Sequence, residues 1–453
     1  MSFYFAQEAA EVVRVLEGYG FEAYYVGGCV RDNLLGVVPK DFDVTTNAMP
    51  EQVIECFSSY QVIPTGLRHG TVTVVINHMP VEVTTYRIDG SYTDNRHPEQ
   101  VAFTASLRED LKRRDFTVNA LAYNKKTGLI DYFGGLADLK AKRIRCVGEP
   151  CQRFHEDALR ILRALRFSSV LSFSMESKTS RAVHEWKGLL ENIAKERIAA
   201  EFGKMLCGFG IEHVMLEYPD VLEMFIPEYL PAVGFQQNNA HHIYDVYTHI
   251  CKTVAHAPPV LTTRLTMAFH DIGKPNTFTR GSDGVGHFYG HHKEGARMAR
   301  KILTRLRYDN ATIDRVETLI LYHDVSMPGD KKTVKRWMNR LTVPVLQELM
   351  QVKKADTLGK NPKYFYKIPL IYAFERQMEQ ILQSGECYNL KGLAVNGSDL
   401  IAEGLPRGKG IGFILDGLLE AVIDETVPNE KQPLLQYAEQ LYQKFGVRNH
   451  DSF

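Results

Sequence analysis

Short β-rich runs alternate with turns over residues 24–146. The runs YYVGG (24–28), DFDVTT (41–46), TVTVVIN (71–77) and MPVEVTTYRI (79–88) are each typical of a strand. Asn77 and His78 separate the last two runs, which predicts a hairpin that turns at these residues. The pattern therefore predicts a first domain built on a sheet.

From residue 150 onward the pattern changes to a helical period with little strand signal. In EDALRILRALRFSSVL (156–171), the apolar side chains Leu159, Leu162, Ala164 and Leu165 recur at the spacing of one buried helix face. Turn-rich breaks occur near residues 227–234, 281–286 and 362–367. We therefore expect an α+β protein, with a sheet-based head followed by an all-α body.

Composition narrows the class of protein. A chain of 453 residues with 44% hydrophobic and 24% charged residues is typical of a globular protein with two to four domains. No apolar run is long enough to cross a bilayer, and the N-terminal segment lacks the features of a signal peptide. The seven scattered cysteines form no CxxC pair, which favours a reducing cytoplasm.

The charge is balanced overall but clustered locally. A net charge of zero counts against a protein that coats nucleic acid. Basic clusters at residues 112–114, 140–145 and 331–340 are compatible with an RNA enzyme, although a solvated face is the commoner explanation for any one of them alone.

The segment YYVGGCVRDNLLGVVPKDFDVTT (24–46) carries the strongest chemical signal. Gly27 and Gly28 follow a strand and precede a helix, so that main-chain N–H groups can face a triphosphate. Asp41 and Asp43 flank one residue of the next predicted strand, so both carboxylates should lie on one face. With Glu82 as a third carboxylate, they could hold two Mg²⁺ ions. A DxD pair alone is usually a solvated strand edge, but its combination with the glycine turn and Glu82 favours catalysis.

This arrangement resembles the DNA polymerase β-like nucleotidyltransferases, specifically the class II tRNA nucleotidyltransferases (CCA-adding enzymes) and bacterial poly(A) polymerases. The resemblance implies a nucleotidyltransferase head on a mixed sheet. It extends to a catalytic loop (Asp94, Arg96, Pro98) and to a nucleotide-templating helix that contains Arg163. It also implies that the nucleotide contacts Gly27, Gly28, Arg31, Arg113, Arg114, Asp115 and Asn119.

Asp157 and Arg160 are the candidate templating pair. At i and i+3 of a helix they should share a face, where the bland alternative is a surface salt bridge. Aspartate accepts and guanidinium donates hydrogen bonds, so the pair complements the Watson–Crick edges of cytosine and adenine. Uracil and guanine present the reverse order, and would leave the protein groups unpaired. We therefore expect CTP and ATP as substrates, with Glu156 orienting Arg160.

The middle of the chain resembles the HD-domain phosphohydrolases. His249, the doublet His270–Asp271 and Asp356 match that superfamily in order and spacing, and His291 and His323–Asp324 fall where many members carry additional ligands. A lone histidine is more often a core residue, but a set in this order favours a divalent metal site with Mn²⁺, Ni²⁺, Fe or Mg²⁺. The resemblance implies hydrolysis of a 2′,3′-cyclic phosphate or 3′-phosphate on RNA.

We therefore predict four domains: a head (1–147), a helical neck for nucleotide choice (148–230), an HD domain (231–385) and a helical tRNA-binding tail (386–453). The predicted activity is template-independent addition of C and A to the tRNA 3′ end, with no membrane partner. CC-only addition, A-only addition and poly(A) synthesis stay open as alternatives within the family. Rivals outside it are an HD phosphohydrolase and an RNA-binding protein, each with a degenerate head. The sequence indicates no oligomeric state.

Overall fold

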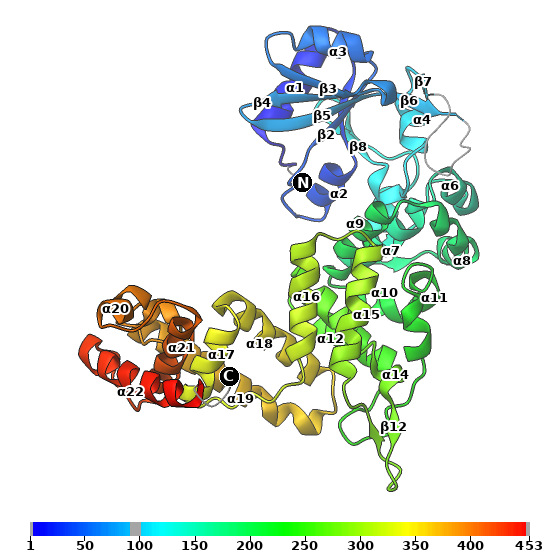
Figure 1. Ribbon diagram of the computed structural model, residues 1–453. Coiled ribbons are helices and arrows are strands. Elements are labelled where there is room, and N and C mark those ends of the chain that lie inside the picture. The colour runs from blue at the N-terminus through cyan, green and yellow to red at the C-terminus, as the bar shows by residue number, and fades with distance from the viewer. Residues whose placement is uncertain (1–2, 91–100, 450–453) are drawn as a thin grey trace. The chain divides into compact units, whose positions relative to one another are not determined.

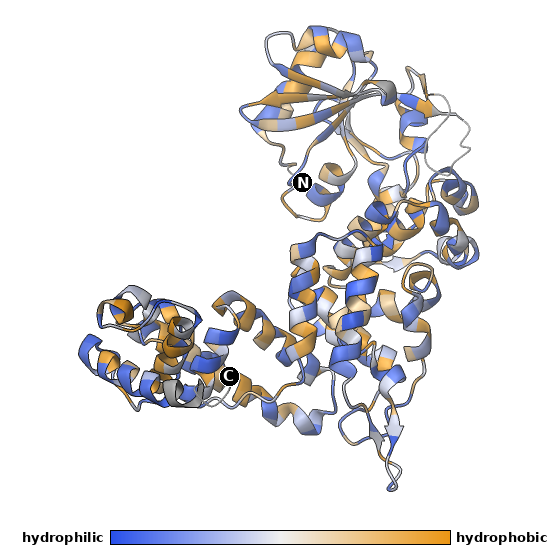
Figure 2. Ribbon diagram, viewed as in Figure 1, coloured by the Kyte–Doolittle hydropathy of each residue, from blue (hydrophilic) through white to orange (hydrophobic). Residues whose placement is uncertain are grey.

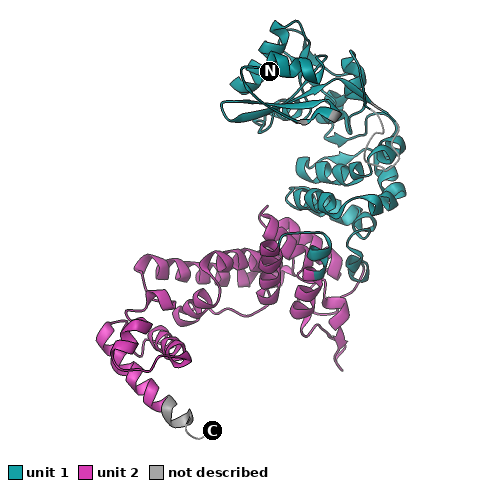
Figure 3. Ribbon diagram, turned by 45° about the horizontal axis from the view of Figure 1, so that its top comes forward, with its two compact units in different colours: residues 1–233, 301–309 teal, residues 234–300, 310–453 magenta. Residues whose placement is uncertain are grey.

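The protein is described by a computed structural model that covers residues 3–90 and 101–449. It forms two compact units, residues 1–233 with 301–309 and residues 234–300 with 310–453 (Figure 3). The predicted fold class is confirmed, because a head built on a mixed sheet is followed by a helical body (Figure 1).

A seven-stranded sheet forms the centre of the head, with the order β3-β4-β5-β2-β1-β8-β9. Strands β2 and β5 run parallel, and the other neighbours in this sheet run antiparallel. The strands are β1 (Ala23–Val26), β2 (Asp43–Thr46), β3 (Gln61–Gly66), β4 (Thr71–Ile76), β5 (Met79–Thr85), β8 (Ala122–Asn124) and β9 (Gly128–Ile130).

The predicted hairpin is confirmed. Strands β4 and β5 pair up to Ile76 and Met79, and the two residues between them, Asn77 and His78, have φ of 48° and 66°. Two consecutive positive φ values are typical of a type I′ turn, whose twist matches that of the strands. Along β4 alternate residues are buried, which places one face of the hairpin against the core.

Helices of the head cover the sheet and carry part of the site. Helix α1 contacts β1, β2 and β5, and α3 contacts β4 and β5. Leu107 and Leu111 of α4 join Val26, Tyr86 and Ala122 in a buried cluster. These helices are α1 (Gln7–Gly18), α2 (Gly28–Leu34), α3 (Pro50–Cys56), α4 (Leu107–Lys112) and α5 (Gly135–Lys140), and the 3₁₀ turn η2 covers Thr117–Asn119; a separate two-stranded sheet pairs β6 (Arg87–Asp89) with β7 (Val101–Phe103).

The rest of unit 1 is helical. The predicted apolar face of residues 156–171 is confirmed on α7, where Leu159, Leu162, Ala164 and Leu165 are buried. Helix α7 packs against α9. The principal helices are α6 (Pro150–Glu156), α7 (Leu159–Leu171), α8 (Ser177–Trp186), α9 (Lys195–Leu206), α10 (Ile211–Glu217) and α11 (Pro219–Leu222), and β10 (Arg143–Ile144) pairs with β11 (Ser174–Met175).

Unit 2 contains two groups of helices. In the first, α12, α13, α16 and α18 pack against one another, and in the second α20, α21 and α22 enclose a cluster that includes Leu400, Leu418 and Leu434. Figure 2 shows hydrophobic and hydrophilic residues interspersed along these helices, as expected where one face is buried. Within the described residues, no helix is long and apolar enough to cross a membrane.

The helices of this unit are α12 (Val246–His256), α13 (Leu261–Phe269), α14 (Lys274–Thr277), α16 (Asn310–Tyr322), α17 (Lys331–Arg340), α18 (Val343–Leu358), α19 (Ile368–Ser384), α20 (Gly397–Ala402), α21 (Lys409–Ile423) and α22 (Lys431–Asn449), together with the part of α15 (His291–Arg305) up to residue 300. The predicted break near residues 281–286 forms the turn of a short hairpin between β12 (Thr279–Arg280) and β13 (Gly286–His287).

Candidate functional site

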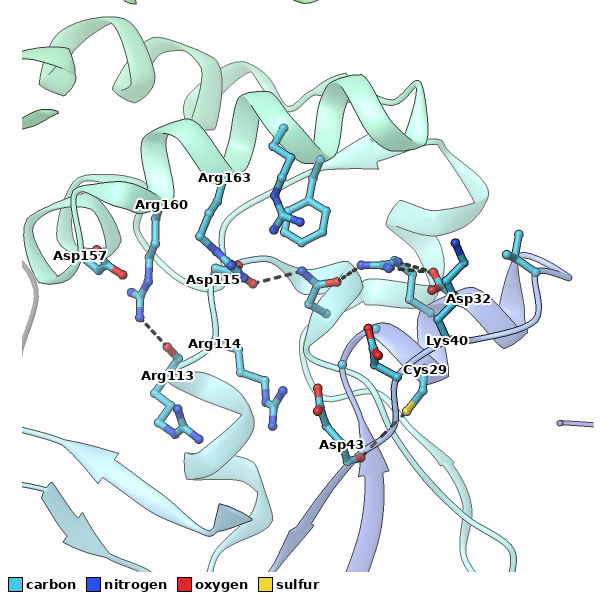
Figure 4. A pocket seen from close by; sticks show the side chains of 18 of the residues that line it. Cys29, Asp32, Lys40, Asp43, Arg113, Arg114, Asp115, Asp157, Arg160 and Arg163 are labelled. Carbon is cyan, nitrogen blue, oxygen red and sulfur yellow. Dashed lines mark hydrogen bonds and ion pairs between the residues drawn. The ribbon is translucent and has the colours of Figure 1, made fainter. Parts of the chain in front are cut away.

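A cavity of about 580 Å³ in unit 1 gathers most of the site residues predicted for the head and the neck (Figure 4). They come from the start of α2, the segment before β2, the segment after α4, and the start of α7. The predicted residues that line it are Gly27, Gly28, Arg31, Asp41, Asp43, Arg113, Arg114, Asp115, Asn119, Asp157, Arg160 and Arg163.

The two aspartates do not both lie on a strand, as the sequence pattern had suggested. Strand β2 begins at Asp43, because pairing with β1 and β5 stops there, and Asp41 precedes the strand and is exposed. Asp43 is in register with Glu82 on the parallel strand β5, so these two side chains point to the same face of the sheet. A smaller cavity of about 180 Å³ is lined by Asp43 and Glu82. Asp43 therefore lines the larger cavity together with Asp41, and the smaller cavity together with Glu82.

Negative charge accumulates around Asp43. The pKa of Asp43 is raised to about 6, because burial and the carboxylates of Glu82 and Asp41 together outweigh the opposing Arg114 guanidinium. A divalent cation would relieve this repulsion, and oxygen ligands suit Mg²⁺. The three carboxylates are not among the described groups whose ligand atoms all lie within 4.8 Å of one another. They fit a magnesium site by donor type, although they converge less tightly than the sequence suggested.

Gly27 brings the main chain close to this site. It has φ 73° and ψ −129°, a backbone conformation that is strained for any residue other than glycine. A Cβ atom there would lie 3.2 Å from Nη1 of Arg114 and 3.8 Å from Oδ2 of Asp43. The main chain of the predicted glycine turn therefore lies directly beside the side chains of Arg114 and Asp43.

Replacing Gly27 by alanine is expected to destabilise the fold by about 2 kcal/mol, because alanine is strained at this φ and ψ. It should also lower nucleotide incorporation by displacing Arg114. Gly18→Ala is the matched control: Gly18 ends α1 with open space around its Cα, so stability should stay equal or rise slightly. Denaturant unfolding of both variants tests this, and equal stabilities would contradict it.

Asp110 was not predicted from sequence, although it holds two of the predicted arginines. Its fully buried carboxylate receives hydrogen bonds from Nε of Arg113 at 3.0 Å and from Thr45 Oγ1 at 3.2 Å, and Nη2 of Arg114 lies 3.5 Å away. The available signal was the spacing of Arg113 and Arg114, at i+3 and i+4 from Asp110, in the last turn of α4 and the residues that follow it. We infer that Asp110 positions both guanidinium groups.

A continuous polar chain links α7 to α2 (Figure 4). Arg163 donates to Asp115 at 2.8 and 2.5 Å, and Asn119 donates to Asp115 at 3.2 Å. Arg31 then donates to Asn119 at 2.6 Å and to Asp32 at 2.8 Å. Burial alone would raise the pKa of Asp115, but Arg163 holds it down, at about 2. Asp115 is therefore ionised at neutral pH and fixes Arg163.

Replacing Asp115 by asparagine is expected to destabilise the protein by about 2 kcal/mol at pH 7, the value that corresponds to the lowered pKa. A lowered pKa in the folded state contributes stability that is complete above about pH 4 and is lost as the pH falls towards 2. The difference from the unsubstituted protein should shrink over that window in urea unfolding, whereas Glu191→Gln, at an exposed carboxylate, should show little difference. A pH-independent difference would exclude the ion pair as its cause.

The predicted i, i+3 helix face of Asp157 and Arg160 is wrong. Asp157 is extended, with φ −138° and ψ 103°, and separates α6 from α7. Its Oδ1 accepts a hydrogen bond from the main-chain N–H of Leu159 at 3.1 Å, and this local bond competes with a continuous helix. Both side chains nevertheless line the same cavity, as Figure 4 shows.

Arg160 is held by its surroundings. Its guanidinium contacts Glu156 Oε2 at 2.6 Å and the carbonyl oxygen of Arg113 at 3.0 Å, and it is 8% exposed. The expected contact with Glu156 is therefore present. Arg197 of α9 lies 3.4 Å from Oδ2 of Asp157. Charged partners thus fix both candidate templating groups before any nucleotide enters.

A second cluster, in unit 2, contains the predicted HD residues. His249 of α12, His270 and Asp271 after α13, and Asp356 of α18 are buried, as are His291 and His323. Two groups have ligand atoms within 4.8 Å of one another: His249, His270 and Asp271, and Asp271, His291 and His323. Asp324 lines the adjacent cavity but is exposed and belongs to neither group.

The aspartates make this cluster favourable for cations. Burial would lower the pKa of His270, but Asp271 and Asp356 raise it to about 9. Buried imidazole and carboxylate groups at such distances are the donor set of a first-row metal site.

The catalytic loop predicted from Asp94, Arg96 and Pro98 of the head lies outside the described residues.

Three family models match the chain. The Poly A polymerase head domain matches residues 23–145, the probable RNA and SrmB-binding site of polymerase A matches residues 172–229, and the putative tRNA nucleotidyltransferase domain 2 matches residues 291–438.

Complete relatives and solved structures are similar over almost the whole chain. The CCA-adding enzyme of Enterococcus faecalis (strain ATCC 700802 / V583) is 32% identical over 434 residues, 95% of this chain and 95% of that protein. The crystal structure of the Bacillus stearothermophilus CCA-adding enzyme in complex with CTP is 28% identical, with a TM-score of 0.73 over 98% of both chains. The Thermotoga maritima CCA-adding enzyme complexed with tRNA_CCA, 20% identical with a TM-score of 0.58 over 96% of this chain and 95% of that one, shares the fold.

Proposed function

Because the chain belongs to the family of CCA-adding enzymes, which are tRNA nucleotidyltransferases, we propose that it adds C and A from CTP and ATP to the 3′ end of tRNA. The observation that carries this is the cavity in unit 1, where acidic residues of the head and the Asp157–Arg160 pair face one space. The similar Bacillus stearothermophilus enzyme was solved with CTP, which supports a nucleotide in this space.

Asp41, Asp43 and Glu82 would hold Mg²⁺ in the head. When bound, the ions lower the pKa of the RNA 3′-hydroxyl and neutralise the triphosphate. Arg113 and Arg114, held by Asp110, direct positive charge into both cavities, where they would bind phosphate oxygens. The glycine turn lets phosphates approach the main chain, because no Cβ intervenes.

Nucleotide choice is assigned to Asp157 and Arg160. Glu156 and the Arg113 carbonyl fix the guanidinium, and Arg197 stands beside the carboxylate. A fixed donor beside a fixed acceptor complements cytosine and adenine, whereas uracil and guanine would leave buried polar groups unpaired. This assignment needs both side chains in one cavity, and does not need them on one helix turn.

The experiment that tests the function supplies tRNA ending at the discriminator base, at C or at CC, with labelled CTP and ATP. Addition of three, two and one nucleotides, respectively, is expected. Products that stop after CC, that gain A on the CC substrate alone, or that lengthen with A without limit would assign the chain to the three alternative activities. No incorporation with intact tRNA binding would favour an RNA-binding protein with a degenerate head.

A second function is favoured by the buried cluster in unit 2. His249, His270, Asp271 and Asp356 would bind a divalent metal ion, which when bound would activate water for attack on a phosphate ester. An adjacent cavity of about 460 Å³ is lined by Lys274, Lys360 and Lys367. Their positive charges suit an anionic substrate such as a 2′,3′-cyclic phosphate or 3′-phosphate of RNA. Opening of the cyclic phosphate to a phosphomonoester, or release of phosphate from a 3′-phosphate end, would support this activity if it is lost in His270→Ala and kept in Asp43→Ala.

The division into a head (1–147), a neck (148–230), an HD domain (231–385) and a tRNA-binding tail (386–453) remains part of this proposal. The head would catalyse transfer, and the neck would select the nucleotide. The tail would hold the tRNA. A reducing cytoplasm, where tRNA is processed, is the proposed compartment, and the seven cysteines, all in described residues, are without disulfides.

A further inference from the structure

The turn that leads into α15 forms part of the wall of the cavity of about 460 Å³ in unit 2. Strand β13 ends one turn before α15, which begins at His291. The N–H of His291 donates to the carbonyl oxygen of Phe288 at 3.1 Å, and Gly290 has φ 77°. A positive φ at this position is typical of a type II turn. Tyr289 occupies the second position of this turn and is 77% exposed.

Aromatic packing holds this turn in place. The rings of Phe235, Phe278 and Phe288 contact one another, with centroids 5.3, 5.5 and 6.5 Å apart. In β13, the N–H of Gly286 donates to the carbonyl oxygen of Asn238 at 2.8 Å. The hairpin and the turn that follows it are therefore fixed to the rest of unit 2 on both sides.

His287 and Tyr289 form a stacked pair of rings on this wall. Their centroids are 5.3 Å apart, their planes differ by 9°, and both side chains line the cavity. A single exposed tyrosine is common on a protein surface and needs no explanation. A parallel pair on the wall of a charged cavity is different, because it offers a flat apolar surface to a further planar ring.

The inner end of the cavity is charged. Asp271, Lys274 and Asp356 line it and are 1 to 4% exposed. Lys274 Nζ lies 2.6 Å from Asp271 Oδ2, and Lys360 Nζ lies 2.5 Å from Asp356 Oδ2. These ammonium groups can donate hydrogen bonds to the oxygens of a phosphate. The cavity thus combines an aromatic wall with a charged end formed by these four residues.

One nucleotide could reach both parts of the cavity. Tyr289 precedes the buried His291 by two residues, so their Cα atoms are at most about 7 Å apart. In a nucleotide, a single ribose separates the 3′-phosphate from the base. A phosphate near His291 would therefore bring its base to the level of Tyr289. A volume of about 460 Å³ lies within the range of sites for small ligands.

We propose that His287 and Tyr289 form a base-stacking platform for a nucleoside phosphate, whose phosphate occupies the charged end of the cavity. This inference rests on the proposed hydrolytic function for the choice of a phosphate ester, and it adds the residues that bind the base. Tyr289 makes the stacking contact, and His287 supports the tyrosine ring from its other side.

The identity of the base is expected to matter little. Every base has a π face, so stacking on an aromatic side chain tolerates all four. The amide of Asn239, which also lines the cavity, is already engaged. Its Oδ1 accepts from the main-chain N–H of His241 at 3.1 Å, and its Nδ2 donates to the carbonyl oxygen of Gln237 at 3.2 Å. All four nucleoside phosphates should therefore bind.

The binding test adds 2-aminopurine riboside 3′-monophosphate, whose fluorescence falls when its base stacks, to the full-length protein without divalent metal. Tyr289→Ala should raise the dissociation constant at least about 10-fold, whereas Tyr289→Phe, which keeps the ring, should change it by no more than about 2-fold. Tyr366→Ala is the matched control, since Tyr366 is 61% exposed and lies outside the cavity. Probe bound in the head of unit 1 would be unaffected by these variants, so the differences between them report the platform.

A hydrolysis test uses the same proteins loaded with Mn²⁺. For adenosine 2′,3′-cyclic phosphate, Tyr289→Ala should raise KM at least about 10-fold and leave kcat unchanged. Methyl ribofuranoside 2′,3′-cyclic phosphate, which has no base, should have the same KM in both proteins. A trinucleotide that ends in the fluorescent probe distinguishes two sources of the ligand. An RNA end would bind as tightly as the mononucleotide, whereas a site for free nucleotides would bind the trinucleotide more weakly.

The outcomes separate the platform from the hydrolytic function. Hydrolysis with the dissociation constant and KM unchanged in Tyr289→Ala would overturn the platform and leave the hydrolytic site intact. Weaker probe binding in Tyr289→Ala, without hydrolysis of either substrate, would support the platform and overturn the hydrolytic function. An equal rise in KM for the substrate without a base would mean that Tyr289 shapes the cavity, which would overturn the platform. Neither quenching nor hydrolysis would overturn both.

Discussion

Replacing Asp43 by alanine is expected to reduce nucleotide incorporation by at least about 10³-fold, the effect of losing about 4 kcal/mol of transition-state stabilisation at a metal site. Asp43 is the carboxylate that faces both cavities and stands in register with Glu82. Its removal would take away a proposed metal ligand of the head, and the affinity for tRNA should stay unchanged. Single-turnover incorporation of CTP and the affinity for tRNA, measured together, check both parts.

The matched control is Glu55→Ala, which removes an exposed carboxylate of α3 outside both cavities. It should incorporate CTP as the unsubstituted protein does. Asp41→Ala should resemble Asp43→Ala in activity, with less effect on stability because Asp41 is exposed. If Asp43→Ala still incorporated CTP at the unsubstituted rate, the proposal that the head catalyses nucleotide transfer through Asp43 would be wrong.

Discrimination against UTP is expected to fall by about 10- to 100-fold in Arg160→Lys, because the penalty for leaving buried polar groups unpaired is then reduced. Lysine can keep the charge pair with Glu156, but it lacks the planar fork that presents fixed donors. Selection should therefore weaken before transfer is lost. Competition between labelled UTP and CTP at equal concentrations measures the ratio.

Arg143→Lys provides the control, since Arg143 is exposed and does not line the cavity. Its ratio of CTP to UTP incorporation should equal that of the unsubstituted protein. If Arg160→Lys keeps that ratio too, while its transfer rate falls, Arg160 would be a structural residue and the base would be read elsewhere.

Local patterns predicted what depends on local structure. The alternation of residues 71–88 was sufficient for the β4–β5 hairpin, because period and turn residues both act within a few residues. The order of the HD residues predicted which side chains gather in the buried cluster of unit 2, but not that Asp271 belongs to both groups of possible metal ligands. That property depends on where α13, α15 and α16 place their ends, which no local pattern encodes.

Two errors have a common physical cause. Strand β2 begins at Asp43 because its pairing with β1 and β5 begins there. The break at Asp157 depends on one side chain-to-main chain bond and on Arg197 from α9. Periodicity alone extends both elements by one or two residues. Asp110 was missed because a buried acidic residue among basic residues reads as a surface charge pattern until its burial is known.

The polar chain from Arg163 through Asp115, Asn119 and Arg31 to Asp32 has an evolutionary consequence. Side chains in one hydrogen-bonded chain do not contribute independently, so double substitutions along it should deviate from additivity. A substitution in α7 that favours one nucleotide therefore changes the effect that a later substitution in α2 has on activity and stability. Specificity and phosphate binding in this head would evolve through compensated pairs of substitutions, with the first member of each pair carrying most of the cost.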